Sequence, residues 1–249
     1  MSGAGIVGQP RRIIMKSVLA ALVASSLIVG CALPELEEDV TASDTGSGGG
    51  GGGGTTYQDT TAPDRVVVST GADHTCAVTE DQSVECWGLY PDVPEGLKAT
   101  SLSAGIDHTC AVTEDQSVQC WGYDNSGQMD VPEGLKATSV GAGYQHTCAV
   151  TEDQSVQCWG YGGNLLNVPE GLKATSLSAG VFHTCAVTED QSVQCWGTDR
   201  HGQMGVPEGL KATSVGAGEQ HTCATKEDQS VVCWGNSANN RLNVPKSLQ

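Results

Sequence analysis

The stretch HTCAVTEDQSVQCWG, from His108 to Gly122, decides the fold of this chain, because the chain repeats it with few changes. Each copy opens on His-Thr-Cys-Ala and closes on Cys-Trp-Gly. The copies begin at His74, His108, His146, His183 and His221. Successive copies are 34, 38, 37 and 38 residues apart, a spacing typical of arrays of one supersecondary unit. The chain therefore predicts five tandem repeats rather than a single irregular core.

The segment before the repeats predicts export. Arg11, Arg12 and Lys16 precede an apolar run over residues 17–30, which is too short to span a bilayer comfortably but suits a signal peptide. Ile28-Val29-Gly30-Cys31 resembles the lipobox of bacterial lipoproteins, which implies cleavage before Cys31 and acylation of that residue. We therefore expect residues 1–30 to be a lipoprotein signal. An ordinary cleaved signal with an incidental Cys is the alternative.

Residues 31–62 predict a flexible tether, and residues 63–249 the folded domain. Acidic residues over 35–39 are followed by seven consecutive glycines over 48–54, which lose much entropy on ordering and gain nothing by burial. The lipoprotein resemblance implies a bacterial membrane-anchored protein. Ala32 stands where an Asp commonly retains such proteins at the inner membrane, so we expect the outer membrane, with the domain in the periplasm or on the cell surface.

The charge of the chain excludes two classes of partner. Its net charge is −17, with only 12 Lys and Arg among 249 residues. Nucleic acids and anionic membrane surfaces both attract proteins through clustered basic residues, and this chain has no such cluster. We therefore expect no nucleic acid partner, and membrane attachment through the lipid alone.

The repeated cysteines predict one disulfide in each repeat. If the segment from Cys76 to Cys86 is a hairpin that turns at residues 80–82, the two cysteines face each other, as do Val78 and Val84. Facing residues of a non-hydrogen-bonded antiparallel pair lie about 4.5 Å apart at Cα, within disulfide range. The predicted disulfides join Cys76 to Cys86, Cys110 to Cys120, Cys148 to Cys158, Cys185 to Cys195 and Cys223 to Cys233. Metal binding by the repeated His and Cys is the alternative. Five three-ligand sites would be unusual in an oxidising compartment, so we expect no metal and no cofactor.

Alternation along the hairpin predicts a sheet that is packed on both faces. His74, Cys76 and Val78 share one face, while Thr75, Ala77 and Trp87 share the other. A further strand precedes each hairpin, as at residues 98–104. Sheets packed on both faces and repeated radially are propeller blades, so we predict an all-β propeller of five short three-stranded blades. The first strand near residues 65–68 could complete the unit that follows Val244-Pro245, which favours a closed ring over an open arc.

Two near-identical copies show where the chain varies. Residues 101–138 and 176–213 are each 38 residues long and differ at six positions. The differences are Ile106/Val181, Asp107/Phe182, Tyr123/Thr198, Asn125/Arg200, Ser126/His201 and Asp130/Gly205. They fall in the loop before the repeated His and in the loop after Trp-Gly. Antiparallel strand order places both loops at one edge, which we call the loop rim, and the Glu-Asp-Gln turns at the opposite turn edge.

The repeat resembles a known family. Ala-Gly-x-x-His-Thr-Cys-Ala-Val, Ser-Val-x-Cys-Trp-Gly and Gly-Gln-Met-x-Val-Pro (residues 127–132) resemble the short form of the regulator of chromosome condensation repeat, which is similar to β-lactamase inhibitor protein type II. The resemblance implies three-stranded blades and protein binding through the loop-bearing face. The chain departs from the family in having Gln where Gly usually follows Glu-Asp, and in having five units instead of seven.

The loop rim carries the predicted binding residues, because aromatic residues and Arg are common interface hot spots. We expect contacts from Asp107, Tyr123, Asp124, Tyr144, Tyr161, Phe182, Arg200 and His201, with Tyr90 and Arg241 as further candidates. Free drift of loops that carry no packing constraint is the alternative. The repeated His and Trp are expected to pack the blades. The turn carboxylates are expected to be a solvated edge, with a weak calcium site as the alternative.

The function expected from these features is protein binding by an anchored, exported lipoprotein. A carbohydrate-binding or envelope-adhesion module, or a structural surface protein, is the second class, suggested by the loop tyrosines. The third class is an enzyme. No Ser-His-Asp arrangement, phosphate loop or carboxylate pair stands out from the repeats, so we expect no catalytic residues.

Overall fold

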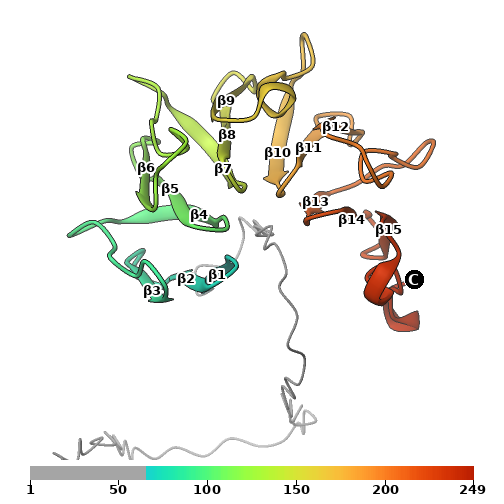
Figure 1. Ribbon diagram of the computed structural model, residues 1–249, viewed down its shortest axis with the longest axis horizontal. Helices are drawn as coiled ribbons and strands as arrows, with labels where there is room; N and C mark the ends of the chain where they lie inside the picture. The colour runs from blue at the N-terminus through green and yellow to red at the C-terminus, as the bar shows by residue number, and fades with distance from the viewer. Residues whose placement is uncertain (1–65) are drawn as a thin grey trace, which may run out of the picture. The chain divides into compact units, whose positions relative to one another are not determined.

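The computed structural model describes residues 66–249, which form five antiparallel sheets of three strands each (Figure 1). We call these sheets blades 1 to 5 in chain order. Blade 1 contains β1 (Val67–Thr70), β2 (His74–Val78) and β3 (Val84–Gly88), and blade 2 contains β4 (Ala99–Ala104), β5 (His108–Thr113) and β6 (Val118–Gly122). Blade 3 contains β7 (Ala137–Ala142), β8 (His146–Thr151) and β9 (Val156–Gly160), and blade 4 contains β10 (Ala174–Ala179), β11 (His183–Thr188) and β12 (Val193–Gly197). Blade 5 contains β13 (Ser214–Ala217), β14 (His221–Thr225) and β15 (Val231–Gly235).

Three short 3-10 helices complete the described elements: η1 (Gly163–Leu166), η2 (Ala238–Asn240) and η3 (Lys246–Leu248). Within residues 66–249, no helix is long and apolar enough to cross a membrane. The predicted signal, the predicted acylation of Cys31 and the predicted tether all lie outside the described residues.

The hairpins have the predicted register. In blade 1, Cys76 pairs with Cys86 and Val78 with Val84, and the other four blades repeat this pairing. The alternation of Val, Cys and Ala with polar residues thus produces strands whose two faces both carry buriable side chains.

All five predicted disulfides are present, each within one hairpin. The Cα atoms of each pair lie 4.0 to 4.1 Å apart. The second cysteine of every pair is half-buried, because it stands on the outermost strand of its blade. The bonds join Cys76 to Cys86, Cys110 to Cys120, Cys148 to Cys158, Cys185 to Cys195 and Cys223 to Cys233. Each blade is therefore closed covalently between its second and third strands.

The turn edge is built around a residue with positive φ. Gln82 has φ 66°, and its counterparts in blades 2 to 5 have φ between 65° and 67°. A left-handed conformation costs an L-residue about 1–2 kcal/mol. The Gln82 carbonyl accepts a hydrogen bond from Ala99 N of blade 2 at 2.9 Å, so this turn also joins neighbouring blades.

The hydrophobic core is divided into four similar clusters, one at each boundary between blades. Between blades 1 and 2, Cys76, Val78 and Val84 of one blade pack against Leu102 and Trp121 of the next. Equivalent side chains form the clusters at the other three boundaries. Each blade therefore contributes a different face to each of its two neighbours, so burial depends on stacking of blades.

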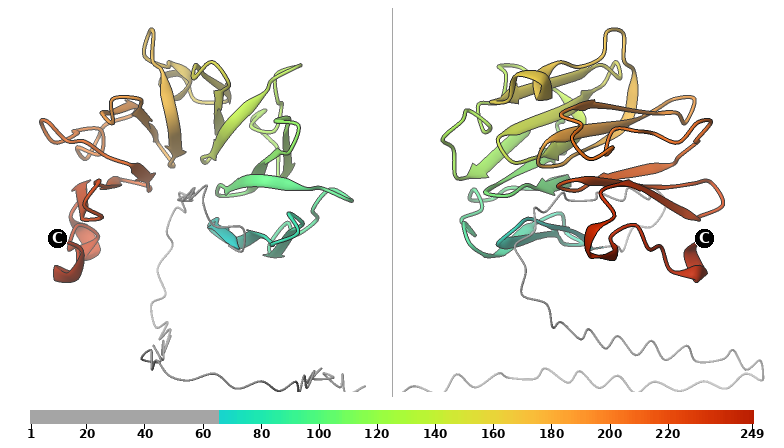
Figure 2. Two further views of the ribbon diagram at one scale, coloured as in Figure 1. Left: turned by 180° about the vertical axis from the view of Figure 1, so that it is seen from behind. Right: turned by 45° about the vertical axis from the view of Figure 1, so that its right-hand side comes forward.

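The five blades follow one another in an open arc, with their first strands innermost (Figures 1 and 2). Blade 1 and blade 5 are separated by a gap in Figure 1 and in the left view of Figure 2, so the described residues form the arc and not the closed ring that the sequence favoured. The reason lies in the boundaries. Between blades 2 and 3, the Gly143 carbonyl accepts a hydrogen bond from Ile106 N at 3.2 Å. The same carbonyl lies so close to Gly105 that a Cβ there would not fit. Such contacts set the angle between blades, and four such steps do not return the chain to blade 1.

Candidate functional site

The loop rim exists as predicted, because a backbone hydrogen bond joins the two variable loops within each blade. In blade 2, Tyr123 N donates to the Asp107 carbonyl at 2.8 Å. In blade 3, Tyr161 N donates to the Gln145 carbonyl at 2.7 Å, and blade 4 has the same bond from Thr198 N to the Phe182 carbonyl at 2.8 Å. The loop before the repeated His and the loop after Trp-Gly therefore form one surface.

Aromatic side chains are exposed on this rim. Their exposed fractions are 45% for Tyr123, 37% for Tyr144, 67% for Tyr161 and 41% for Phe182. They occupy three consecutive blades. Tyr90 of blade 1 stacks on Tyr123, with ring centroids 6.1 Å apart and planes 20° apart, which joins a further candidate to the set.

The charged candidates lie on the same loops but differ between blades. Asp124, Arg200 and His201 are exposed, whereas Asp107 is half-buried. Asp107 of blade 2 is replaced by Phe182 at the same position of blade 4. The loops of blade 2 thus carry Asp107, Asp124 and Tyr123, whereas the equivalent loops of blade 4 carry Phe182, Arg200 and His201.

A buried glutamine organises the longer loop, a role that the sequence reasoning did not identify. Gln128 is 1% exposed. Its Oε1 accepts from Ser126 N at 2.9 Å, and its Nε2 donates to the Tyr123 carbonyl at 3.0 Å. Gln203 makes the same bonds in blade 4, to His201 N and the Thr198 carbonyl. The sequence does hold an indication of this role, because Gly-Gln recurs at residues 127–128 and 202–203 while several residues around it differ between the two loops.

The same glutamine also connects the loop to the next blade. The Gln128 carbonyl accepts from Thr147 Oγ1 at 2.8 Å and from Trp159 Nε1 at 3.0 Å. In blade 3, the Leu165 carbonyl accepts from Trp196 Nε1 of blade 4 at 3.0 Å. The loops after Trp-Gly of blades 2, 3 and 4 are therefore each bonded to the next blade, and those of blades 2 and 4 are also held internally by a buried glutamine.

The repeated histidines are buried at the blade boundaries below the rim. Nε2 of the first four lies 2.7 to 2.9 Å from a threonine hydroxyl of the next blade. Because Thr147 donates its hydroxyl proton to the Gln128 carbonyl, it accepts from His108, whose Nε2 is therefore protonated. Burial, together with the smaller effects of the nearby His146 and His74, lowers the pKa of His108 to about 3. Burial also lowers the pKa of His146 and of His183 to about 4. These rings are neutral hydrogen-bonding groups at physiological pH.

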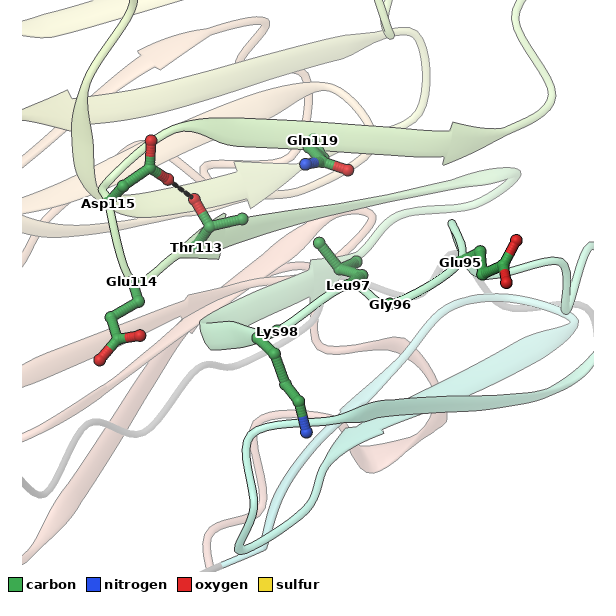
Figure 3. A pocket seen from close by; sticks show the side chains of 8 residues that line it. All are labelled: Glu95, Gly96, Leu97, Lys98, Thr113, Glu114, Asp115 and Gln119. Carbon is green, nitrogen blue, oxygen red and sulfur yellow. Dashed lines mark hydrogen bonds between the residues drawn. The ribbon is translucent and has the colours of Figure 1, made fainter.

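The turn edge carries shallow, open pockets instead of a dedicated site. One of about 500 Å³ is lined by residues 95–98 of the connection between blades 1 and 2, and by Thr113, Glu114, Asp115 and Gln119 (Figure 3). A similar pocket lies two blades further along, where residues 170–173 of the connection between blades 3 and 4 meet the turn of blade 4. Because the pocket recurs with the repeat, it follows from the packing of successive blades.

The turn aspartates are occupied by protein groups. Asp115 Oδ1 accepts from the hydroxyls of Thr113 and Ser117, and Oδ2 accepts from Lys136 Nζ of the next blade at 2.8 Å. These partners, Lys136 first, hold the pKa of Asp115 well below its usual range. Across residues 66–249, no group of three or more His, Cys, Asp or Glu is placed to hold a metal ion.

The sequence of the blades matches a known family of repeats. The model of the regulator of chromosome condensation (RCC1) repeat matches residues 99–128, 137–164, 174–203 and 212–241, which correspond to blades 2 to 5. A comparison with curated proteins found no match.

Solved structures share the fold. The CRINKLY WD40 ectodomain of the Arabidopsis thaliana receptor kinase ACR4 has a TM-score of 0.60 and 29% identity, over 68% of this chain and 64% of that chain. The ectodomain of the Physcomitrella patens receptor kinase CR4 has a TM-score of 0.60 and 27% identity, over 68% and 50%. Prp20p of Saccharomyces cerevisiae has a TM-score of 0.61 and 19% identity, over 73% and 60%.

This chain spans less than two thirds of the length of each of these three structures. The likeness nevertheless confirms the predicted all-β fold of the propeller type. Together, the four tandem matches and the series of three-stranded blades show that this chain is a repeat protein of the regulator of chromosome condensation type.

Proposed function

We propose that this chain binds another protein through the loop rim, as an exported lipoprotein held at the bacterial envelope by acylation of Cys31. The outer membrane is the proposed location. The observation that carries the proposal is the confinement of all six differences between residues 101–138 and 176–213 to loops that the structure brings together at one edge.

The composition and the rigidity of the rim support this proposal. Exposed aromatic residues and Arg supply most of the binding energy in typical protein interfaces. Tyr123, Tyr144 and Phe182 are exposed on three consecutive blades. The buried Gln128 bonds to the Tyr123 carbonyl, and Val181 N beside Phe182 donates to the Gly218 carbonyl of blade 5 at 3.3 Å. A rigid loop loses little conformational entropy on binding, so its contacts contribute more fully to affinity.

A protein with the same fold, yeast Prp20, binds other proteins. Prp20p binds Gsp1p and histones, and a second structure shows Kap60 bound to yeast RCC1 (Prp20). These two are 19% and 17% identical to this chain, so they support the use of the fold for protein binding without indicating the partner.

Affinity capture from envelope extract tests the proposal. The full chain is compared with a double variant, Tyr144→Ala with Phe182→Ala, which removes two exposed rings from neighbouring blades. Hot-spot truncations cost about 2 kcal/mol or more each, so we expect at least a tenfold loss of the captured partner.

The matched control is Glu114→Gln with Glu189→Gln, which changes two exposed residues of the opposite edge in blades 2 and 4. It should capture the same partner as the unchanged chain. Equal capture by the rim variant and the unchanged chain would contradict binding through the rim.

Carbohydrate binding at the rim is the second candidate, because the stacked pair Tyr90 and Tyr123 presents an aromatic surface suited to a sugar ring. Binding to glycans or peptidoglycan that is lost in Tyr123→Ala would favour this function. The absence of any such binding would remove it.

A further inference from the structure

Every boundary between blades joins two different faces, which we name for their central residues. The His face of one blade carries the repeated His, the first Cys and two Val. The Trp face of the next blade carries the repeated Thr, Ala and Trp, together with a Leu or Val of its first strand. The His Nε2 to Thr Oγ1 hydrogen bond crosses each of the four boundaries. An uncovered His face therefore fits an uncovered Trp face.

Blade 1 presents an uncovered Trp face within the described residues. Trp87 is 54% exposed, whereas Trp121, Trp159, Trp196 and Trp234 are 4% to 7% exposed. Val68 is 48% exposed, and its counterpart Leu102 in blade 2 is fully buried. Thr75 is half-buried, although the equivalent Thr of every other blade is at most 1% exposed. The side chains that normally pack against another blade are thus present here without one.

Blade 5 presents the matching His face. His221 is half-buried, and its Nε2 has no hydrogen-bond partner among residues 66–249, whereas the other four repeated His residues bond to a Thr of the next blade. Cys223 is half-buried, while its four counterparts are 0% exposed. Leu248 is 45% exposed, and Leu97, Leu135 and Leu172, which precede the first strands of blades 2, 3 and 4, are buried. These groups lack the Trp face that covers their counterparts.

The loop after β15 also carries a carbonyl, that of Arg241, which accepts no hydrogen bond from residues 66–249. Arg241 lies three residues before Val244-Pro245, as Leu165 lies three residues before Val168-Pro169. Its N–H bonds to the Ala238 carbonyl at 3.4 Å, as Leu165 N–H bonds to the Gly162 carbonyl at 2.9 Å. Since the Leu165 carbonyl receives the indole N–H of Trp196, the Arg241 carbonyl is placed to receive a further indole.

We propose that the His face of blade 5 binds the Trp face of blade 1 of a second copy of this chain. His221 Nε2 then donates to Thr75 Oγ1 of the second copy, and Trp87 of the second copy covers Cys223 and donates to the Arg241 carbonyl. The two uncovered faces lie apart within one chain (Figures 1 and 2), so the contact forms between chains. Apart from the Arg241 carbonyl in the loop after β15, this surface lies outside the loop rim, and the contact does not depend on the proposed function.

Such a contact is head-to-tail, so a row of copies keeps one open His face and one open Trp face at its two ends until it closes. Head-to-tail contacts produce a closed ring if the rotation between copies closes, and otherwise a helical filament. Both assemblies bury Trp87, and both contain the same pair of faces.

Photo-crosslinking of the full chain tests the contact directly. A benzophenone amino acid replaces Trp87 in a chain of normal isotopic composition, which is extracted in mild detergent and mixed with unmodified chain labelled with nitrogen-15. We expect an ultraviolet-dependent adduct that joins a light peptide containing position 87 to a heavy peptide from residues 214–248. The same benzophenone at position 161, which is 67% exposed on the loop rim, should give no adduct with residues 214–248.

A variant pair of the heavy chain provides the matched control. Thr225 is half-buried on the His face of blade 5, and Thr225→Arg places a bulky cation there while Thr225→Ser preserves the surface. Thr225→Arg should reduce the adduct at least tenfold, and Thr225→Ser should not. Adducts that join only light peptides to one another would show that blade 1 meets blade 5 of its own chain. That result, an adduct with another protein alone, or no adduct would overturn the proposal.

Discussion

The indole Nε1 of Trp159 in blade 3 donates a 3.0 Å hydrogen bond to the carbonyl oxygen of Gln128 in blade 2. The Thr147 hydroxyl donates to the same oxygen at 2.8 Å. In blade 1 the corresponding loop is shorter, and Trp121 Nε1 has no hydrogen-bond partner among the described residues. A residue of the loop rim thus serves blade packing, which explains why the loop can vary around Gln128 while that residue is repeated in blade 4.

Removal of the Gln128 side chain should loosen the loop without breaking the blade. Gln128→Ala removes two half-buried hydrogen bonds, one from the Ser126 N–H and one to the Tyr123 carbonyl, and at about 0.5–1.5 kcal/mol each their loss costs about 1–3 kcal/mol. We expect the free energy of unfolding, measured with guanidinium and intact disulfides, to fall by about that amount. Gln119→Ala, at an exposed position of the same blade, should be neutral, and equal effects of the two changes would contradict this role.

The buried histidines should make the fold sensitive to mild acid. His146 and His183 have pKa values lowered to about 4 by burial, while an unfolded His titrates near 6.5. Below pH 6.5 the unfolded chain therefore binds protons that the folded chain does not. The contribution of these histidines to the free energy of unfolding is therefore fully present above about pH 6.5 and is lost as the pH falls toward 4.

The expected slope is at most about 1.4 kcal/mol per pH unit for each such histidine. Guanidinium midpoints between pH 7.5 and 5 measure it, and His146→Gln should reduce the slope. A midpoint that stays constant over this range would show that the histidines are not held neutral by the fold.

The disulfides should contribute separately to stability. Each disulfide joins two cysteines ten positions apart in the sequence. For a loop of this length the chain-entropy model predicts a stabilisation of about 3 kcal/mol. We expect the paired change Cys110→Ala with Cys120→Ala to lower the free energy of unfolding by about 3 kcal/mol while the other four hairpins persist. Disulfide mapping by mass spectrometry checks that the remaining pairs are unchanged, and a stability equal to that of the unchanged protein would contradict the model.

The proposed lipid anchor predicts that membrane attachment depends on one atom, the sulfur of Cys31. Multiple acyl chains hold a protein durably, because each buried methylene contributes about 0.8 kcal/mol. Cys31→Ser should abolish incorporation of radiolabelled palmitate. The variant should either move from the membrane fraction to the soluble fraction or keep its signal uncleaved. Cys31→Ala should behave identically, whereas labelled palmitate in either variant would place the acylation elsewhere.

Local sequence was sufficient to predict the blades. The pairing of Cys76 with Cys86, the five disulfides and the placement of both variable loops at one edge follow from period-two alternation and antiparallel order, which depend on neighbours along the chain. The sequence also indicated that Tyr123, Tyr144, Tyr161 and Phe182 lie on the rim, where the structure exposes them. Their role in binding a partner stays a prediction.

The relation between blades could be decided only by the tertiary structure. The open arc, the Trp159 bond to Gln128, the half-burial of Asp107 and the exposure of Trp87 all depend on how closely and at what angle successive sheets pack. That angle results from many contacts across residues some 35 to 39 positions apart, such as His74 with Thr109 and His108 with Thr147. Repeat number and strand pattern do not encode it, because the same blade stacks into a ring or an arc according to small changes in these contacts.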